Sequence, residues 1–221
     1  MSTLKLTPKA AILPVIEPIA QWEKVSIQMD TSSVALVEPL DASVARDVYP
    51  LPQTADREGY HDERHGDYWF SGLKDYALTV GACRRFGLDI GKSSRVFELG
   101  CASGRVLRHF AIQSGCHCKG ADINANHVEW INRYLPENVS AIDATFHPPL
   151  ALPDNAFDLS CAFSVFTHVE HFETAWLQEL SRITRPTGLV FATIHSEHTW
   201  KRIKTTYFYQ ALNAMKDRIR D

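Results

Sequence analysis

The segment from Arg95 to Phe110 constrains the fold of this chain more than any other stretch. Its first part, V-F-E-L at 96–99, is mostly apolar, as is typical of a short buried strand. The small residues from Gly100 to Gly104 predict a tight turn, and apolar residues then recur at helical spacing until Gly115, where a helix would end. A strand, a small-residue turn and a helix form the opening unit of a nucleotide-binding, doubly wound α/β sheet.

The residues of this turn discriminate between ligands. A dinucleotide-binding turn needs glycine at its first, third and sixth positions, which here hold Gly100, Ala102 and Arg105, so the sixth position fails. Glu98 precedes the turn, and its carboxylate would repel a pyrophosphate but attract a cation. S-adenosylmethionine meets this demand because it carries a sulfonium and an ammonium group and no phosphate.

The pattern Glu98-x-Gly100-x-Ala102-x-Gly104 resembles motif I of the class I S-adenosylmethionine-dependent methyltransferases, whose usual form is Glu/Asp-x-Gly-x-Gly-x-Gly. Ala102 departs from the commonest form. Further landmarks of the family follow in its order: C-K-G-A-D-I at 118–123, a strand ending at Asp143, L-P-D-N-A-F-D-L at 152–159 and L-S-R-I-T-R-P-T-G at 180–188. The resemblance covers about residues 60–200 and is to a bacterial-type small-molecule methyltransferase domain.

The resemblance implies a Rossmann-like α/β fold with strand order 3-2-1-4-5 and helices on both faces. The fourth strand is expected to run from 157 to about 168, and 185–188 are expected to turn into a fifth strand at 189–195. The usual last two strands have no counterpart, because 197–221 predict one amphipathic helix. We divide the chain into an N-terminal extension (1–58) and a methyltransferase domain (59–221), with a lid and pre-sheet helix at 59–92 and the core sheet at 93–196.

Acids at strand ends are the second part of the predicted cofactor site. Asp122 follows Gly100 by 22 residues, near the spacing of an acid that binds ribose hydroxyls, although an aspartate here could equally cap the next helix. The resemblance places the ribose at Asp122 and the adenine amino group at Asp143. The full set of predicted cofactor-binding residues is Glu98, Gly100, Cys101, Ala102, Ser103, Gly104, Asp122, Ile123, Asp143, Ala144, Phe163 and Ser164.

Two further groups complete the predicted site. Aromatic and ionisable residues precede a helix whose face Trp69, Leu73, Tyr76, Val80 and Cys83 would form, with Gly87 as its stop. Lid and acceptor-binding candidates are Tyr60, Arg64, His65, Tyr68, Phe166, Thr167 and His171. A general base is needed only if the acceptor loses a proton, and His168 and then His195 are the candidates. No metal site is predicted, because His168, Glu170 and His171 cannot all face one point on a regular helix.

Composition limits the partners and the compartment. The net charge is −3, so no broad basic face argues for nucleic acid. Five cysteines, an odd number, suggest a reduced, cytoplasmic protein, and the start of the chain, broken by Pro14 and Pro18, is neither a signal peptide nor a membrane span. A homodimer is an open alternative.

The expected function is transfer of a methyl group from S-adenosylmethionine to an oxygen or nitrogen of a metabolite, sugar or natural product. One alternative is a non-catalytic or truncated methyltransferase-like binding module, favoured by the short C-terminal part and opposed by the intact acids. The other is a nicotinamide-dependent oxidoreductase, which Glu98 and Arg105 oppose.

Overall fold

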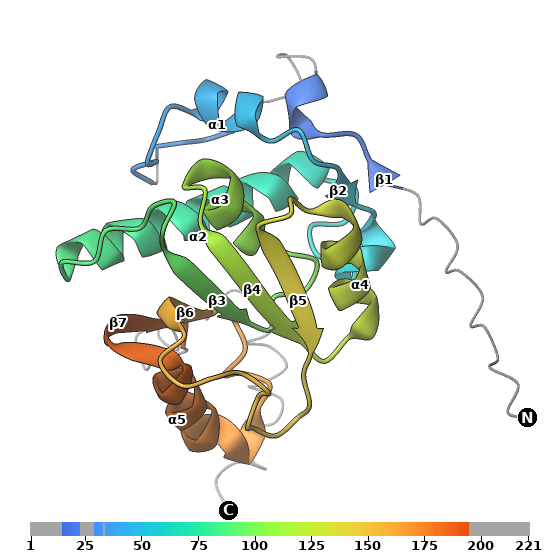
Figure 1. The fold of residues 1–221 in the computed structure, drawn as a ribbon. Coiled ribbons are helices and arrows are strands. Elements are labelled where there is room, and N and C mark those ends of the chain that lie inside the picture. The colour runs from blue at the N-terminus through green and yellow to red at the C-terminus, as the bar shows by residue number, and fades with distance from the viewer. Residues whose placement is uncertain (1–14, 23–28, 33, 195–221) are drawn as a thin grey trace, which may run out of the picture.

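A five-stranded parallel sheet organises the computed structural model, which describes residues 15–22, 29–32 and 34–194 (Figure 1). Its strands are β3 (Arg95–Leu99), β4 (His117–Asp122), β5 (Val139–Asp143), β6 (Phe157–Ala162) and β7 (Thr184–Ala192). They lie in the order β5-β4-β3-β6-β7, which is 3-2-1-4-5 when counted from β3. The predicted fold class and strand order are therefore confirmed. The chain adds an antiparallel pair outside this sheet, β1 (Val15–Ile16) with β2 (Leu51–Pro52).

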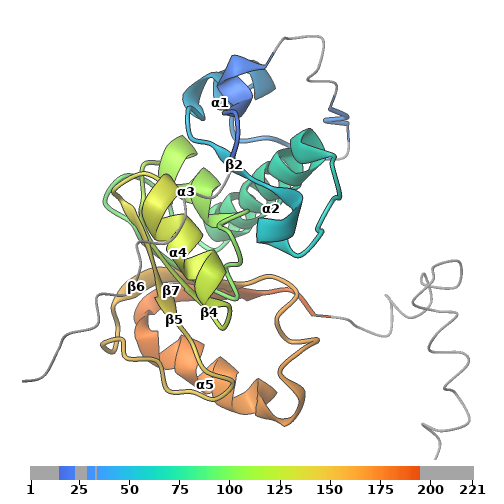
Figure 2. The ribbon, with the colours of Figure 1, turned by 90° about the vertical axis from the view of Figure 1, so that its right-hand side faces the viewer.

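Helices cover both faces of the sheet. Figure 2 shows α2 (His65–Arg85), α3 (Leu107–Gln113) and α4 (Ala125–Tyr134) on one face and α5 (Glu173–Ile183) on the other. Because successive side chains of β3 point to opposite faces of the sheet, the strand contributes to two buried clusters. Val96 packs with α2, α3 and α4, whereas Phe97 and Leu99 pack with α5. Because Glu98 follows the same alternation as Val96, it points towards the α2–α3 layer.

The long helix α2 forms where the apolar spacing predicts it. Its predicted face is buried, and Phe86 and Gly87 close its last turn, Gly87 with a φ of +80° that suits glycine. Gly72 is required at the crossing with the motif segment, since a Cβ there would lie 2.0 Å from the Arg105 carbonyl oxygen. The glycine therefore lets α2 approach the start of α3.

The N-terminal segment packs on the helical layer. It contains η1 (Ile19–Gln21), α1 (Leu40–Arg46) and η3 (Thr54–Arg57), and Ile19 and Leu51 are fully buried in the cluster that α2 forms with the sheet. Asp47 makes an ion pair with Arg108 of α3 at 2.7 Å, with both side chains fully buried, and accepts a hydrogen bond from the Trp69 indole. This pair ties the segment to both α2 and α3.

Two predicted strand boundaries are wrong. β6 ends at Ala162 rather than near His168, because Ser164 has a φ of +58° and donates its N–H to Thr193 Oγ1 at 2.7 Å. Residues 185–188 are not a separate turn but part of β7, where the register with β6 shifts between Phe157 and Leu159. His195 and the helix expected at 197–221 lie outside the described residues.

Candidate functional site

The turn between β3 and α3 has three left-handed residues at alternate positions. Gly100, Ala102 and Gly104 have φ values of +65°, +44° and +77°. The Gly100 and Cys101 N–H groups both donate to the Ala121 carbonyl oxygen of β4, and the Gly104 N–H donates to the Cys101 carbonyl oxygen. The motif is therefore folded against the neighbouring strand at the carboxyl edge of the sheet.

Packing within the protein requires the two glycines of this turn. A Cβ on Gly100 would lie 2.5 Å from Val165 Cγ2, and one on Gly104 would lie 2.7 Å from Leu135 Cδ1 beside α4. Cys101 and Ser103 are also buried. Close approach of a ligand is thus not needed to explain why residues 100 and 104 are small, although the sequence alone suggested that reason.

Ala102 holds a backbone conformation that costs an L-residue about 1–2 kcal/mol. We expect Ala102→Gly to raise the free energy of unfolding by about 1 kcal/mol, since relief of that strain exceeds the entropy cost of a glycine. Chemical denaturation of both proteins measures the difference. Ala111→Gly, in α3, is the matched control and should lower the stability by about 0.5–1 kcal/mol; an equal loss at position 102 would contradict the expectation.

Asp122 ends β4 directly beneath the motif turn. Its carboxylate accepts hydrogen bonds from the Ala102 N–H at 2.7 Å and the Asn124 N–H at 2.9 Å, and His127 Nδ1 lies 3.4 Å from it. Burial alone would raise the pKa of Asp122, but the hydrogen bonds from His127, Asn124 and Ala102 hold it below its ordinary value. Asp122 is therefore an ionised acceptor, and Asn124 caps α4 through its own side chain.

Asp143 lies beside Asp122 at the same edge. The two residues are register partners on β5 and β4, and the Ala144 N–H donates to the Asp122 carbonyl oxygen. Asp143 is exposed, as is Ile123, whose side chain is 58% accessible. An acid and an apolar side chain thus stand open to solvent next to the motif turn.

The loop after β6 brings other predicted residues to this edge. Phe163 is buried and its ring lies 5.8 Å from that of Phe191, whereas Ser164 is exposed. Thr167 donates to the Ser164 carbonyl oxygen, and His168 is exposed. Phe166 is half-buried and His171 is exposed in η4 (Glu170–Phe172).

Glu98 is more enclosed than the sequence suggests. Its side chain lies in the α2–α3 layer, it is only 3% exposed, and its Oε2 has no hydrogen-bond partner among the described residues. Desolvation raises the pKa of Glu98 to about 8, against the influence of Arg105, which pairs with Asp75 at 2.7 Å. A buried carboxyl oxygen without a partner is suited to receive a cation.

The predicted lid residues separate into two kinds. Tyr60 is exposed beneath the Arg105 guanidinium, and Arg64 is exposed in an ion pair with Asp67. His65 begins α2 and is half-buried, whereas Tyr68 is 2% exposed and its hydroxyl has no partner among the described residues. Burial raises the pKa of Tyr68 to about 12.

Four residues that the sequence analysis did not place in the site also reach it: Asp56, Arg57, Glu58 and His127. Ser103 donates its hydroxyl to the Asp56 carbonyl oxygen, and Asn124 donates to Glu58 Oε1 at 3.2 Å. Arg57, between them, is buried, and His127 supports Asp122. The position of His127, five residues after Asp122, was the only signal that could have singled one of these out.

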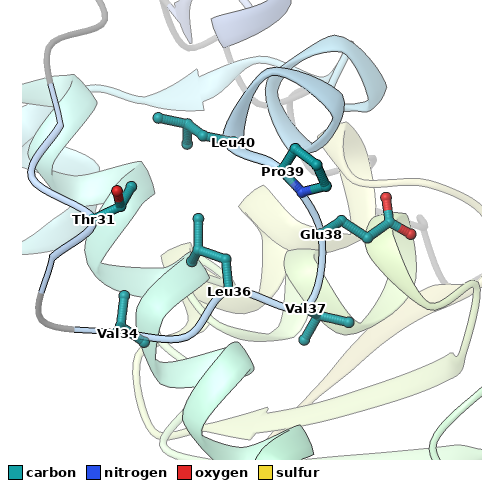
Figure 3. A pocket seen from close by; sticks show the side chains of 7 residues that line it. All are labelled: Thr31, Val34, Leu36, Val37, Glu38, Pro39 and Leu40. Carbon is teal, nitrogen blue, oxygen red and sulfur yellow. The ribbon is translucent and has the colours of Figure 1, made fainter.

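Two hollows among the described residues lie away from this edge. One, of about 370 Å³, is an open hollow of the N-terminal segment (Figure 3) and is lined by Thr31, Val34, Leu36, Val37, Glu38, Pro39 and Leu40. The other lies at the amino ends of the strands, near Arg95 and His117. Within the described ranges we find no cluster of three metal-ligating side chains, and no helix there is long and apolar enough to cross a membrane.

Comparison with known proteins agrees with this geometry. Residues 97–192 match a family model described as a methyltransferase domain. A putative S-adenosyl-L-methionine-dependent methyltransferase from Methanococcus maripaludis is 17% identical, with 72% of this chain and 76% of that chain covered and a TM-score of 0.51. A putative sarcosine dimethylglycine methyltransferase from Galdieria sulphuraria is 16% identical, with 60% and 52% covered and a TM-score of 0.50.

The chain spans about three fifths of the length of other solved structures that it matches. No protein in the curated comparison matches its sequence. The structural similarities establish the fold, and the family model covers the sheet from β3 to β7, including the motif turn, Asp122 and Asp143. Residues 97–192 of this chain are therefore similar to a methyltransferase domain.

Proposed function

We propose that the chain transfers a methyl group from S-adenosylmethionine to an oxygen or nitrogen of a small molecule. The hydrogen bond from the Ala102 N–H to Asp122 Oδ2 carries this proposal, because it joins the motif turn and the second acid into one structure. Ligands of open α/β sheets bind at the carboxyl ends of the strands, and the motif turn and Asp122 lie at that edge.

The acids present suit the parts of the cofactor. Asp122 would accept from the ribose hydroxyls with the lone pairs that its present partners leave free, and Asp143 would accept from the adenine amino group. Ile123 and Ala144 would contact the adenine ring. The unpartnered Glu98 Oε2 is the observation that supports a cationic ligand, since the carboxyl group would gain a counter-charge there.

The cofactor supplies the chemistry in the form of a methyl group on a sulfonium leaving group. The chain's own part is positioning and exclusion of water, with Phe163 and Phe166 bordering the edge. His168 is proposed as the base for an acceptor that must lose a proton, because it lies on the loop that leaves β6, the strand next to β3. We retain His195 as the second candidate on sequence grounds.

A small-molecule acceptor is supported by composition. A net charge of −3 provides no broad positive surface of the kind that binds nucleic acid. Five free cysteines, all buried, are consistent with the proposed cytoplasmic location.

The test begins with cofactor binding. We expect Asp122→Ala to weaken binding of S-adenosylmethionine by about 1.5–3 kcal/mol, because hydrogen bonds from the ribose to an ionised acceptor are lost. Isothermal titration calorimetry measures the affinity. Asp122→Asn keeps the shape and one acceptor oxygen, so it separates ribose binding from support of the Ala102 N–H.

Asp89→Ala removes an exposed carboxylate that lies before β3, away from the carboxyl edge, and should leave the affinity unchanged. Methyl-labelled cofactor is then offered with a mixture of metabolites, and label transfer that the Asp122→Ala protein lacks identifies the acceptor. An unchanged affinity in a folded Asp122→Ala protein would remove this residue from the site, and absence of cofactor binding by the unaltered protein would refute the proposal.

A further inference from the structure

Arg57 lies between two residues that touch the cofactor-binding segments. Asp56 accepts from Ser103 of the motif turn, and Glu58 accepts from Asn124 after β4. The short helix η3 therefore bridges both segments. Arg57 is therefore placed beside the layer that contains the motif turn. The residue is only 3% exposed.

This guanidinium makes no ion pair among the described residues, although Glu63 and Asp62 are acids close enough to act on its charge. All of its hydrogen bonds use one nitrogen, Nη2, and go to neutral groups: the Asp62 carbonyl oxygen, Thr54 Oγ1 at 3.4 Å and His65 Nδ1 at 2.7 Å. Its other two nitrogens, Nε and Nη1, are buried without a partner in the described part of the chain. A buried cation in this state is costly unless an anion joins it.

Other unsatisfied donors gather around the same point. The Arg57 guanidinium lies 4.6 Å from the centre of the Tyr68 ring, and the Tyr68 hydroxyl is buried without a partner in the described ranges. His61 Nε2 is likewise buried and unpartnered within those ranges, and this imidazole lies among Arg57, Arg64 and Arg105, with Asp67 the acid on that side. The nearby Arg105 forms an ion pair with Asp75, whereas Arg57 forms no ion pair within the described residues.

We propose that Arg57, with His61 and the Tyr68 hydroxyl, binds a carboxylate group beside the methyl-transfer site. The inference rests on the proposed function for the origin of that carboxylate, which is either the amino-acid end of the cofactor or an acidic acceptor. Glu98, whose Oε2 is unpartnered in the same layer, supports the first source, because an acid and a guanidinium together match an ammonium and a carboxylate.

The experiment compares ligands with and without a carboxylate. Calorimetry is performed on the unaltered protein, Arg57→Met and Arg57→Lys, with S-adenosylhomocysteine and with its decarboxylated analogue. If the carboxylate belongs to the cofactor, Arg57→Met should weaken binding of S-adenosylhomocysteine by about 10–100-fold, the usual contribution of hydrogen bonds to a charged group. The same change should alter the affinity of the decarboxylated analogue by less than about twofold, since that ligand has no carboxylate to lose. The affinity of Arg57→Lys for S-adenosylhomocysteine should lie between those of the unaltered protein and Arg57→Met, because lysine keeps the charge but not the planar donors.

Acetate and glycine, titrated in the presence of saturating S-adenosylhomocysteine, test the second source. For an acceptor carboxylate, Arg57→Met should leave S-adenosylhomocysteine binding unchanged and abolish saturable binding of these anions. The matched control is Arg133→Met, which removes a guanidinium from the outer face of α4 and should affect neither ligand.

Thermal melts show whether each variant is folded. Because Arg57 is buried without an ion pair and two of its nitrogens have no partner in the described ranges, we expect Arg57→Met to melt no lower than the unaltered protein without ligand. A folded Arg57→Met protein that binds S-adenosylhomocysteine, its analogue, acetate and glycine as the unaltered protein does would overturn the inference. If the unaltered protein binds no S-adenosylhomocysteine, the proposed function fails, and the acetate and glycine titrations still decide whether Arg57 holds a carboxylate.

Discussion

Asp47→Ala is expected to lower the free energy of unfolding by about 3–5 kcal/mol, because it leaves the Arg108 guanidinium buried without a counter-charge. Both side chains are fully buried, and Arg108 donates to both Asp47 oxygens at 2.9 and 2.7 Å. The change also removes the acceptor of the Trp69 indole N–H, which lies 2.6 Å from Asp47 Oδ2. Chemical denaturation at neutral pH measures the loss.

The matched control is Glu38→Gln, which breaks the exposed ion pair between Glu38 and Arg46 at 2.7 Å. Exposed pairs contribute about 0–1 kcal/mol, so the difference between the two variants isolates the effect of burial. The double variant Asp47→Leu with Arg108→Met should recover most of the stability, since it removes both charges together. A loss at position 47 no greater than that at Glu38 would show that the N-terminal segment is not fixed by this pair.

The pH dependence of Asp47 follows from the same contact. Burial alone would raise the pKa of Asp47, but Arg108 holds it below its ordinary value. A carboxyl group with a lowered pKa in the folded state contributes stability that is present above its unfolded pKa and is lost as the pH falls through the folded value. Acid should therefore release the N-terminal segment from α2 and α3.

The sequence predicted those parts of the candidate site's geometry that follow from order along the chain. Gly100, Asp122 and Asp143 each stand at the end of an apolar strand run, and parallel strands bring their carboxyl ends to one edge. The strand order followed from the same reasoning, and the structure confirms it. Local pattern is sufficient here because each residue's position depends on its own strand.

Arg57 could not be predicted in this way. It lies in a segment without strong periodicity, and its placement depends on Asp56 meeting Ser103, which is 47 residues further along the chain. The end of β6 was misplaced for a similar reason: the Thr193 side chain that holds the Ser164 N–H comes from beyond the next strand. Such side-chain contacts between distant segments leave no mark in the hydrophobic pattern.

The state of Glu98 also depends on burial that the motif alone does not reveal. The spacing identified an acid beside the turn, but Glu98 lies within the α2–α3 layer, and α2 packs close to the motif segment through Gly72. Loss of solvation raises the pKa of Glu98 to about 8 from its ordinary 4.5. At neutral pH and without a ligand, the carboxyl group is therefore mostly protonated.

This shift predicts that Glu98→Gln makes the unfolding free energy of the ligand-free protein higher and less dependent on pH. An acid whose folded pKa is raised contributes stability that is fully present below its unfolded pKa and is lost as the pH rises to the folded value. The unaltered protein should therefore lose stability between about pH 4.5 and pH 8 through this residue, by about 3 kcal/mol at pH 7, whereas the glutamine variant should not. Denaturation at a series of pH values measures the gap between the two curves.

Glu179→Gln provides a control of opposite sign, because hydrogen bonds from Arg182 lower the pKa of Glu179, so this variant should be less stable than the unaltered protein at neutral pH. Binding of a cationic cofactor should favour the ionised form of Glu98 and release about one proton at pH 7. Calorimetry in buffers of different ionisation enthalpy detects that proton, and the Glu98→Gln protein should not release it. A glutamine variant that is less stable at every pH, with the pH slope unchanged, would show that Glu98 titrates normally and that no cation is needed beside it.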